Sequence, residues 1–179
     1  MQKIAALVLY LLISFSAFAG YLYGGLSYSF NGVVSEYDAY NGSNKWAPGL
    51  TGGIKFDKLG FELYAKKFTL VNDDYKAGAI EYNIEIDTLM YGLGMRLTLT
   101  EGVEFILGIN SQSISAKSEP QVSFALLEKS YLSYYLGGGF NRVLFDRYRG
   151  HLDMVFYQGD VKYGVLSVII SLVYEFSTF

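Results

Sequence analysis

His151 is the only histidine of the chain, and it lies two residues before Asp153. A serine, an imidazole and a carboxylate together can perform nucleophilic acyl transfer, because the imidazole removes the serine proton while the carboxylate orients the imidazole. Ser167 and Ser171 follow in the next extended run, with the parity that would place them on the same face as His151. These residue types therefore allow an acyl hydrolase or an acyl transferase as one hypothesis.

A second set of candidate residues consists of charged side chains that share one parity of the extended runs. Arg96 and Glu104 flank the short connection 100–102, so a tight hairpin there would make them diagonal neighbours on two strands. An arginine among carboxylates forms bidentate hydrogen bonds, which suits an internal network of ion pairs. The expected members of this charge network are Glu62, Arg96, Glu104, Asp153 and Glu175.

Metal and thiol chemistry has little support in the sequence. The chain has no Cys, which excludes a disulfide, a thiolate metal site and a cysteine nucleophile. Asp73 and Asp74 lack the ligand spacing of a calcium loop. We therefore expect neither a metal nor a cofactor.

The first 19 residues have the features of a secretory signal peptide. Lys3 supplies a short basic region, residues 4–18 are almost wholly apolar, and residues 17–19 form an A-x-A-like cleavage site. The apolar run is shorter than the ~20 residues of a membrane-spanning helix. Removal of this peptide leaves 13 basic and 17 acidic groups, a net charge of −4, which argues against nucleic acid as a partner. We predict one domain over residues 20–179.

The composition of the chain favours strands in a membrane. The sequence is 51% hydrophobic and 17% aromatic, with 17 Tyr and 13 Phe, and both residue types favour strands. After residue 19, no run of 18 uninterrupted apolar residues remains to form a membrane-spanning helix. An exported chain this apolar predicts a closed β-barrel, which is the other structure that satisfies every backbone group in lipid.

The period of the sequence indicates strands with lipid on one face. In residues 89–99 the odd positions hold Leu, Tyr, Leu, Met, Leu and Leu, whereas the even positions hold Met, Gly, Gly, Arg and Thr. Residues 166–176 repeat this alternation, with the apolar side chains at even positions. A period of 2 is that of a strand, since a helix would repeat every 3.6 residues. We expect the apolar sets to face lipid.

Short connections rich in Gly and charge alternate with longer polar stretches, as periplasmic turns alternate with external loops in outer-membrane barrels. The short connections are 57–60, 100–102 and 145–150, and the polar stretches are 32–48, 71–79, 115–128 and 159–162. The strands predicted between them are 21–31, 49–56, 61–70, 80–99, 103–114, 129–143, 151–158 and 163–179. We therefore predict an all-β fold, an eight-stranded antiparallel up-and-down transmembrane β-barrel.

Several predicted strands exceed the ~9–11 residues that cross a membrane, so their outer ends should stand above it. The apolar parity changes near Lys66 and Lys67, and again near Asp87 and Thr88 on the next strand. We predict either a β-bulge or the outer rim of the membrane at this level. One of the two lysines would then be able to meet Glu85 or Asp87.

Three stretches carry a resemblance to a known family: YGLGMRLTLT at 91–100, YYLGGGFNR at 134–142 and SLVYEFSTF at 171–179. With them, residues 20–179 resemble the opacity-protein-like and OmpA/OmpX-like outer-membrane barrels of Gram-negative bacteria. The resemblance implies contact with outer-membrane lipid and assembly by the barrel-assembly machinery, which recognises a terminal aromatic such as Phe179. Phe179 has the opposite parity from the apolar set of its strand, so either the last residues leave the sheet or a bulge intervenes.

The expected barrel limits what its interior can do, because eight strands leave room for little more than side chains. The charge network is therefore expected to plug the lumen, with a gated, narrow ion path as an alternative. A lipid A-modifying enzyme is a further alternative. Two observations disfavour it: His151 follows a short turn and would lie away from the outer leaflet, and the H-x-S-N motif of lipid A deacylases is missing. A soluble lipocalin-type carrier is disfavoured because the non-lipid face is rich in Gly and Ser.

Aromatic residues in the first predicted external loop suggest where the protein acts. Tyr37, Tyr40 and Trp46 lie there, and recognition residues tend to lie on loops of a rigid scaffold. A loop that is merely solvated is the alternative. We predict a monomeric, non-enzymatic, porin-like barrel of the cell envelope with no catalytic residue. Its role would be structural or adhesive, with a host or surface ligand as the partner of its loops.

Overall fold

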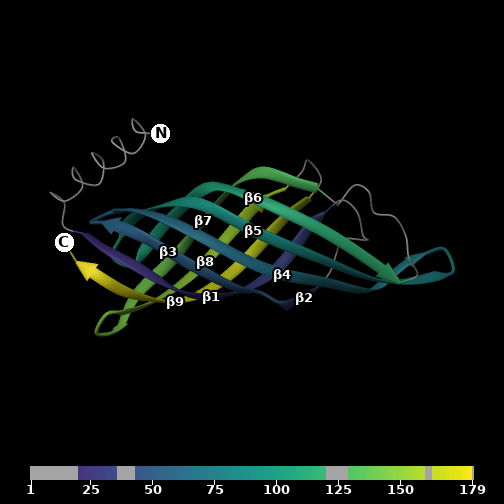
Figure 1. Ribbon diagram of the computed structural model, residues 1–179, viewed down its shortest axis with the longest axis horizontal. Coiled ribbons are helices and arrows are strands. Elements are labelled where there is room, and N and C mark those ends of the chain that lie inside the picture. Colours follow the sequence, from purple (N-terminus) through teal and green to yellow (C-terminus); the bar gives the residue numbers. More distant parts are fainter. Residues whose placement is uncertain (1–19, 36–42, 120–128, 160–162, 179) are drawn as a thin grey trace, which may run out of the picture.

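The computed structural model describes residues 20–35, 43–119, 129–159 and 163–178, and nearly all of them are in strands (Figure 1). The signal peptide predicted at residues 1–19 lies outside these ranges. Across the described residues, no helix is long and apolar enough to cross a membrane. The strands are β1 (Gly20–Ser35), β2 (Ser43–Trp46), β3 (Pro48–Phe56), β4 (Leu59–Ala77), β5 (Ile80–Thr100), β6 (Val103–Glu119), β7 (Lys129–Phe145), β8 (Tyr148–Gln158) and β9 (Tyr163–Thr178).

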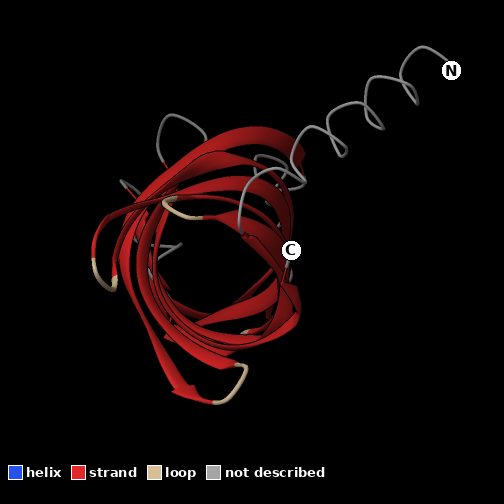
Figure 2. Cartoon of the chain, turned by 90° about the vertical axis from the view of Figure 1, so that its left-hand side faces the viewer, coloured by secondary structure: helices blue, strands red, loops and turns tan. Residues whose placement is uncertain are grey.

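The strands close into a ring, as the end-on view shows (Figure 2). Antiparallel pairing runs from β3 through β4 to β9, and β9 pairs with β1, which pairs with β3. β2 and β3 lie end to end beside β4, and between them the Ala47 carbonyl accepts a hydrogen bond from the Ser29 N–H at 3.0 Å. They therefore occupy one position in the wall, and the predicted eight-stranded up-and-down barrel is confirmed.

Two-residue turns join the strands at the end of the barrel where β1 begins and β9 ends. Asp57 and Asp146 begin two of these turns with φ of 41° and 45°, and Gly102 has φ of 81° in the third. Asp tolerates the left-handed region because its short side chain can bond to nearby backbone. These turns confirm the three short connections predicted from the sequence.

The loop predicted at residues 71–79 is wrong. β4 continues to Ala77 and β5 starts at Ile80, with only Gly78, at φ 68°, and Ala79 between them. In the other predicted loops, β1 continues to Ser35, β2 occupies residues 43–46 and β6 continues to Glu119. The strands run on because a wall that faces water takes polar side chains as readily as a loop does.

The barrel has two levels of opposite polarity. Near the short turns, apolar side chains such as Leu93 are exposed on the outer face, and charged side chains are buried inside. At the other end the large apolar side chains point inward and are buried, whereas the outer face carries Lys, Thr, Glu and Asp. We call residues 67–88 and 113–119, with the side chains that they enclose, the outer tier. Its buried apolar residues include Phe68, Leu70, Ile84, Ile86 and Ile114.

The polarity of the outer face changes because the medium outside the barrel changes, and not because the geometry of the strands changes. The register of β4 and β5 runs without a shift from Leu59–Leu97 to Asn72–Ile84. A bulge at residues 66–67 is therefore wrong, and a membrane rim at this level accounts for the parity change. Of the two lysines predicted to meet Glu85 or Asp87, Lys66 is excluded, because its side chain is buried inside the barrel and bonds to Ser167.

A bulge does occur near the end of β9. Tyr23 pairs with Glu175 whereas Leu22 pairs with Ser177, so Phe176 is an extra residue on β9. A bulge of this kind shifts the alternation by one residue, which is the second of the two alternatives for the carboxyl end. Phe179 itself lies outside the described residues.

The position of the rim predicts how single cysteines react, and each would be unique because the chain has none. On intact cells, a membrane-impermeant maleimide should label Glu85→Cys, which stands on the outer face of the outer tier. Leu93→Cys should stay unlabelled because lipid covers it, and Ile86→Cys should react only after denaturation because its side chain is 1% exposed. Labelling of Leu93→Cys on intact cells would contradict this rim.

Candidate functional site

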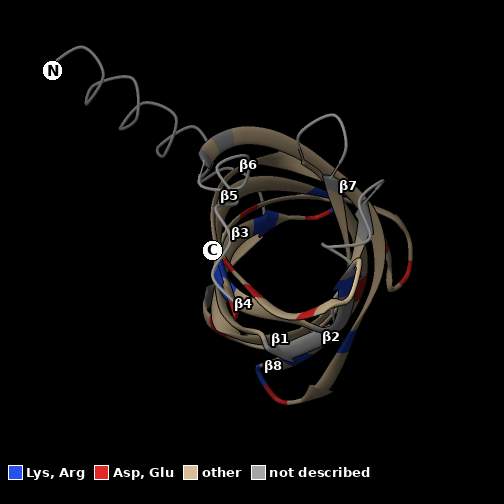
Figure 3. Ribbon diagram, turned by 90° about the vertical axis from the view of Figure 1, so that its right-hand side faces the viewer, with Lys and Arg blue, Asp and Glu red and all other residues tan. Residues whose placement is uncertain are grey.

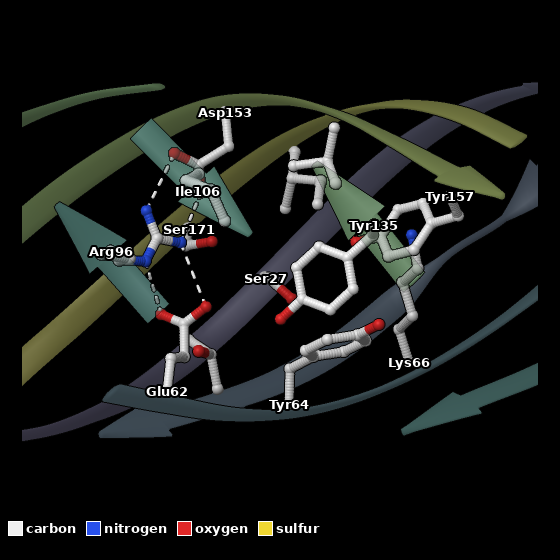
Figure 4. Close-up of a pocket in the computed structure, with 13 residues that line it drawn as sticks. Ser27, Glu62, Tyr64, Lys66, Arg96, Ile106, Tyr135, Asp153, Tyr157 and Ser171 are labelled. Atoms are coloured by element: carbon white, nitrogen blue, oxygen red, sulfur yellow. Dashed lines mark hydrogen bonds and ion pairs between the residues drawn. The ribbon is translucent and has the colours of Figure 1, made fainter. Parts of the chain in front are cut away.

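Arg96 stands at the centre of a buried charge cluster, in the half of the lumen that is nearer to the short turns (Figure 4). Its Nε and Nη2 donate to the two carboxylate oxygens of Glu62 at 3.0 and 3.1 Å. Nη1 and Nη2 donate to Asp153 at 3.1 and 2.7 Å, and Nη1 also donates to Glu104 at 3.2 Å. One guanidinium thus joins carboxylates from β4, β6 and β8 across the barrel.

Glycines make room for this charge cluster. Gly139 pairs with Asp153 across β7 and β8, and a Cβ at Gly139 would collide with the Asp153 carboxylate. Gly94 pairs with Glu62, and a Cβ there would collide with the Tyr135 hydroxyl. Small residues on the inward parity are therefore required where long side chains from opposite walls meet.

Two further side chains belong to the cluster, and the sequence reasoning missed both. Lys55 donates to Glu104, and the Tyr23 hydroxyl donates to Glu62 at 3.0 Å. A signal for Lys55 existed, because it shares the parity of Thr51 and Gly53 on a strand whose odd positions face inward. Lys55 and Arg96 together place two cations against three carboxylates.

Glu175 lies apart from the cluster, although the sequence reasoning grouped it with Arg96. It accepts a hydrogen bond from Nε of Arg149, and both side chains are partly exposed. The Arg149 guanidinium also lies 5.0 Å from the ring centroid of Tyr21. Of the five expected network residues, the structure brings four together and puts Glu175 in a separate pair near the short turns.

A layer of tyrosines fills the lumen beyond the charge cluster. The rings of Tyr64, Tyr135 and Tyr157 contact one another, with centroids 5.3 to 6.1 Å apart. Lys66 lies next to them, with Nζ 4.0 Å from the Tyr157 centroid and 3.0 Å from the Ser167 hydroxyl. A cavity of about 30 Å³ remains between this layer and the Arg96 cluster, which is room for about two water molecules (Figure 4).

Between the tyrosine layer and the outer tier, the lumen is filled first by amide side chains and then by apolar side chains. Gln112 donates to the Ser133 hydroxyl at 2.8 Å and to the Asn110 side chain at 3.3 Å. The apolar core of the outer tier follows, with Phe68 and Ile86 almost wholly buried. In the described part of the chain the lumen is therefore packed with side chains along its length.

The structure brings residues of the hypothetical acyl-transfer triad close together, since His151 pairs with Ser171 across β8 and β9, but among the described residues no hydrogen bond joins the imidazole to a serine or a carboxylate. The His151 ring stacks on Tyr23 with centroids 6.2 Å apart, and within the described residues neither ring nitrogen has a hydrogen-bond partner. Asp153 is bound by Arg96, and Ser167 is bonded to Lys66. The imidazole is also enclosed in the lumen, with 6% of its surface exposed, so lipid cannot reach it.

The structure is silent on the predicted recognition residues of the first loop. Tyr37 and Tyr40 lie outside the described residues, and for Trp46 only the backbone, in β2, is described. For the described residues, no group of three or more His, Cys, Asp or Glu side chains is arranged to hold a metal ion.

Two solved structures have the same fold. One is Ail, the attachment invasion locus protein of Yersinia pestis, in complex with the heparin analogue sucrose octasulfate; it is 14% identical, with a TM-score of 0.50, over 89% of this chain and 99% of that chain. The other is the Neisserial surface protein A, 11% identical with a TM-score of 0.52 over 87% of this chain and 97% of that one. No family model and no curated protein matches the sequence.

The comparison concerns fold, and the surface of this chain agrees with it. Large apolar side chains, among them Leu26, Leu63, Leu132 and Met154, are exposed on the outer face of the barrel. A closed barrel with an apolar outer face and a polar interior suits lipid and not water. The fold is therefore that of the small transmembrane barrels of the bacterial outer membrane.

The charge cluster predicts a large stability loss when its central cation is removed. Arg96→Met leaves buried carboxylates unpaired, which should lower the free energy of unfolding by about 3–5 kcal/mol in a urea titration of the refolded barrel. The matched control is Lys76→Gln, which breaks the exposed pair with Glu81 and should lower it by less than about 1 kcal/mol. Equal losses for the two variants would contradict the central role of Arg96.

Proposed function

We propose that the protein is a non-enzymatic surface barrel of the outer membrane, and that its membrane level anchors an outer tier that contacts a ligand outside the cell. The observation that carries this proposal is the filled lumen, in which ion pairs, tyrosines, amides and apolar side chains follow one another. A barrel filled in this way offers no route for a solute, so its activity belongs to its surface.

The outer tier has the construction of a rigid stalk. Its apolar core holds the strands together without help from lipid, and β4, β5 and β6 keep their pairing through it. The wall thus raises the hairpin of β4 and β5 beyond the membrane level (Figure 1). Rigid scaffolds that carry loops are where recognition sites concentrate, which supports a role for Tyr37, Tyr40 and Trp46.

The charges of the outer tier favour a protein ligand over a polyanion. Ail is described with a heparin analogue, which bears many negative charges. Here the outer face of the tier carries Lys67, Lys76 and Lys117, but also acidic residues in similar number, and Lys76 is already paired with Glu81. A surface so balanced does not attract polyanions, whereas tyrosine and tryptophan are frequent contacts in protein interfaces.

Adhesion of bacteria that display the barrel tests the proposal. A variant with Tyr37→Ala, Tyr40→Ala and Trp46→Ala should bind host cells or matrix proteins at least about tenfold more weakly than the unchanged barrel, because aromatic contacts dominate such interfaces. The control is Tyr134→Ala, which removes an exposed aromatic from the membrane level. Equal adhesion with and without the unchanged barrel would contradict the proposal.

Conductance measurements separate an anchor from the alternative of a narrow ion pore. In planar bilayers the purified barrel should give no steady conductance above the lipid baseline, because the cavity beside Arg96 is only about 30 Å³ and lies between the charge cluster and the tyrosine layer. Stepwise, voltage-independent openings of the unchanged protein would show that the network releases its pairs, and would favour the pore.

A further inference from the structure

The hairpin of β7 and β8 differs from the other short turns in its shape. It bends away from the wall at the lower edge of the end-on views (Figures 2 and 3). β6 begins at Val103, which pairs with Phe140, so β7 continues past the end of its neighbour. Beyond that point the Asn141 N–H still donates to the Gly102 carbonyl at 2.8 Å. Residues 142–146 therefore form a projecting tip, and the Arg147 carbonyl at its base accepts a hydrogen bond from the Glu175 N–H at 2.9 Å.

The projecting tip is apolar on its surface. Val143, Leu144 and Phe145 are consecutive and are 49%, 53% and 60% exposed. Three successive side chains can all be exposed because the register shifts between Val143 and Phe145, which interrupts the alternation of the strand. Exposed apolar residues at the end of a membrane barrel need a cover, and lipid is the nearest apolar phase.

The same hairpin concentrates arginine. Three of the four arginines of the chain, Arg142, Arg147 and Arg149, lie within eight residues of one another. Arg149 is committed to Glu175 and to the ring of Tyr21. Arg142 and Arg147 are exposed, and among the described residues neither has a carboxylate within ion-pair distance. Two guanidinium groups are thus free to bind an anion.

The position of Arg142 indicates what kind of anion it meets. Arg142 has the outward parity of β7, between the exposed side chains of Phe140 and Leu144. It is level with the turn at residues 101–102, because the neighbouring Asn141 N–H donates to the Gly102 carbonyl, and we expect the headgroup layer at such strand ends. Nearby, ring contacts link Phe145, Tyr148, Tyr174 and Phe176, with centroids 4.8 to 5.4 Å apart, as in the aromatic girdle of a membrane interface.

We propose that the β7–β8 hairpin binds anionic phospholipids of the periplasmic leaflet, with lipid phosphates bound by Arg142 and Arg147 and acyl chains along Phe140 and Leu144. Short turns of outer-membrane barrels face the periplasm, so the hairpin meets the leaflet from that side. Arginine suits a phosphate because its donors form a fork that matches two oxygens. Residues 142–147 carry two arginines and the acid Asp146, a net charge of +1, so two identical copies of this hairpin repel each other and a second copy of the chain is a poorer occupant.

This binding is separate from adhesion, because the hairpin lies at the opposite end of the barrel from the outer tier. It gives the protein a selective contact with one class of lipid. Failure of either proposal leaves the other intact.

Spin-labelled lipids provide the test. The full barrel is reconstituted in phosphatidylcholine vesicles with a trace of spin-labelled phosphatidylglycerol or spin-labelled phosphatidylcholine, and the motionally restricted fraction gives their relative association. The unchanged barrel should prefer phosphatidylglycerol, and the variant R142Q/R147Q should lose this preference, by about fivefold for each arginine. The matched control is Lys58→Gln, which removes an exposed cation from the turn at residues 57–58 and should leave the preference unchanged.

Three outcomes would overturn the proposal. They are a preference that survives in R142Q/R147Q, a preference that falls equally in Lys58→Gln, and a change in oligomeric state of R142Q/R147Q without a change in lipid preference. The heat-dependent gel shift of a folded barrel checks each variant. If R142Q/R147Q does not fold, the single variants Arg142→Gln and Arg147→Gln decide the matter, because each should lower the preference by about fivefold whereas Lys58→Gln should not.

Discussion

Closure of the hydrogen-bonded ring is the constraint on which the other features depend. A strand wall in lipid has no water to satisfy an open edge, so β1 must pair with β9 as completely as any other neighbours. Eight positions in the wall then fix a narrow lumen, and the inward side chains meet in its middle. Arg96 reaches carboxylates on β4, β6 and β8 because the ring is narrow. The same closeness leaves room only for glycine at positions such as Gly139.

Inward and outward positions alternate regularly along the strands. Whether the inward positions hold apolar or polar side chains depends on the medium outside the barrel. On β5, even positions face inward along the whole strand, and they hold Ile84 and Ile86 in the outer tier but Arg96 near the short turns. Water outside the outer tier favours an apolar interior, whereas lipid outside the membrane level favours an apolar exterior. One strand therefore serves two solvents without a bulge between the outer tier and the membrane level.

Much of the fold follows from the sequence because lipid enforces strict alternation at the membrane level. Strands, short turns and the closeness of Arg96 and Glu104 were predictable there. The strands of the outer tier were not predictable, because a strand whose outer face contacts water has a polar composition like that of a loop. Residues 71–77 of β4 are an example. Lys55 escaped notice in a short strand rich in Gly, and the partner of Glu175 was hidden because Arg149 lies inside a predicted turn. Pairing partners on distant strands need the register, which alternation alone does not supply.

The energetics of the Arg96 cluster argue for a static plug. Opening a path through the lumen requires the guanidinium to leave its carboxylates, and it makes five hydrogen bonds with them. Breaking a buried ion-pair cluster by removing one partner costs about 3–5 kcal/mol. That is a large fraction of the stability of a small domain. Release of Arg96 would also expose no exit, because the tyrosine layer and the apolar core of the outer tier close the lumen above it.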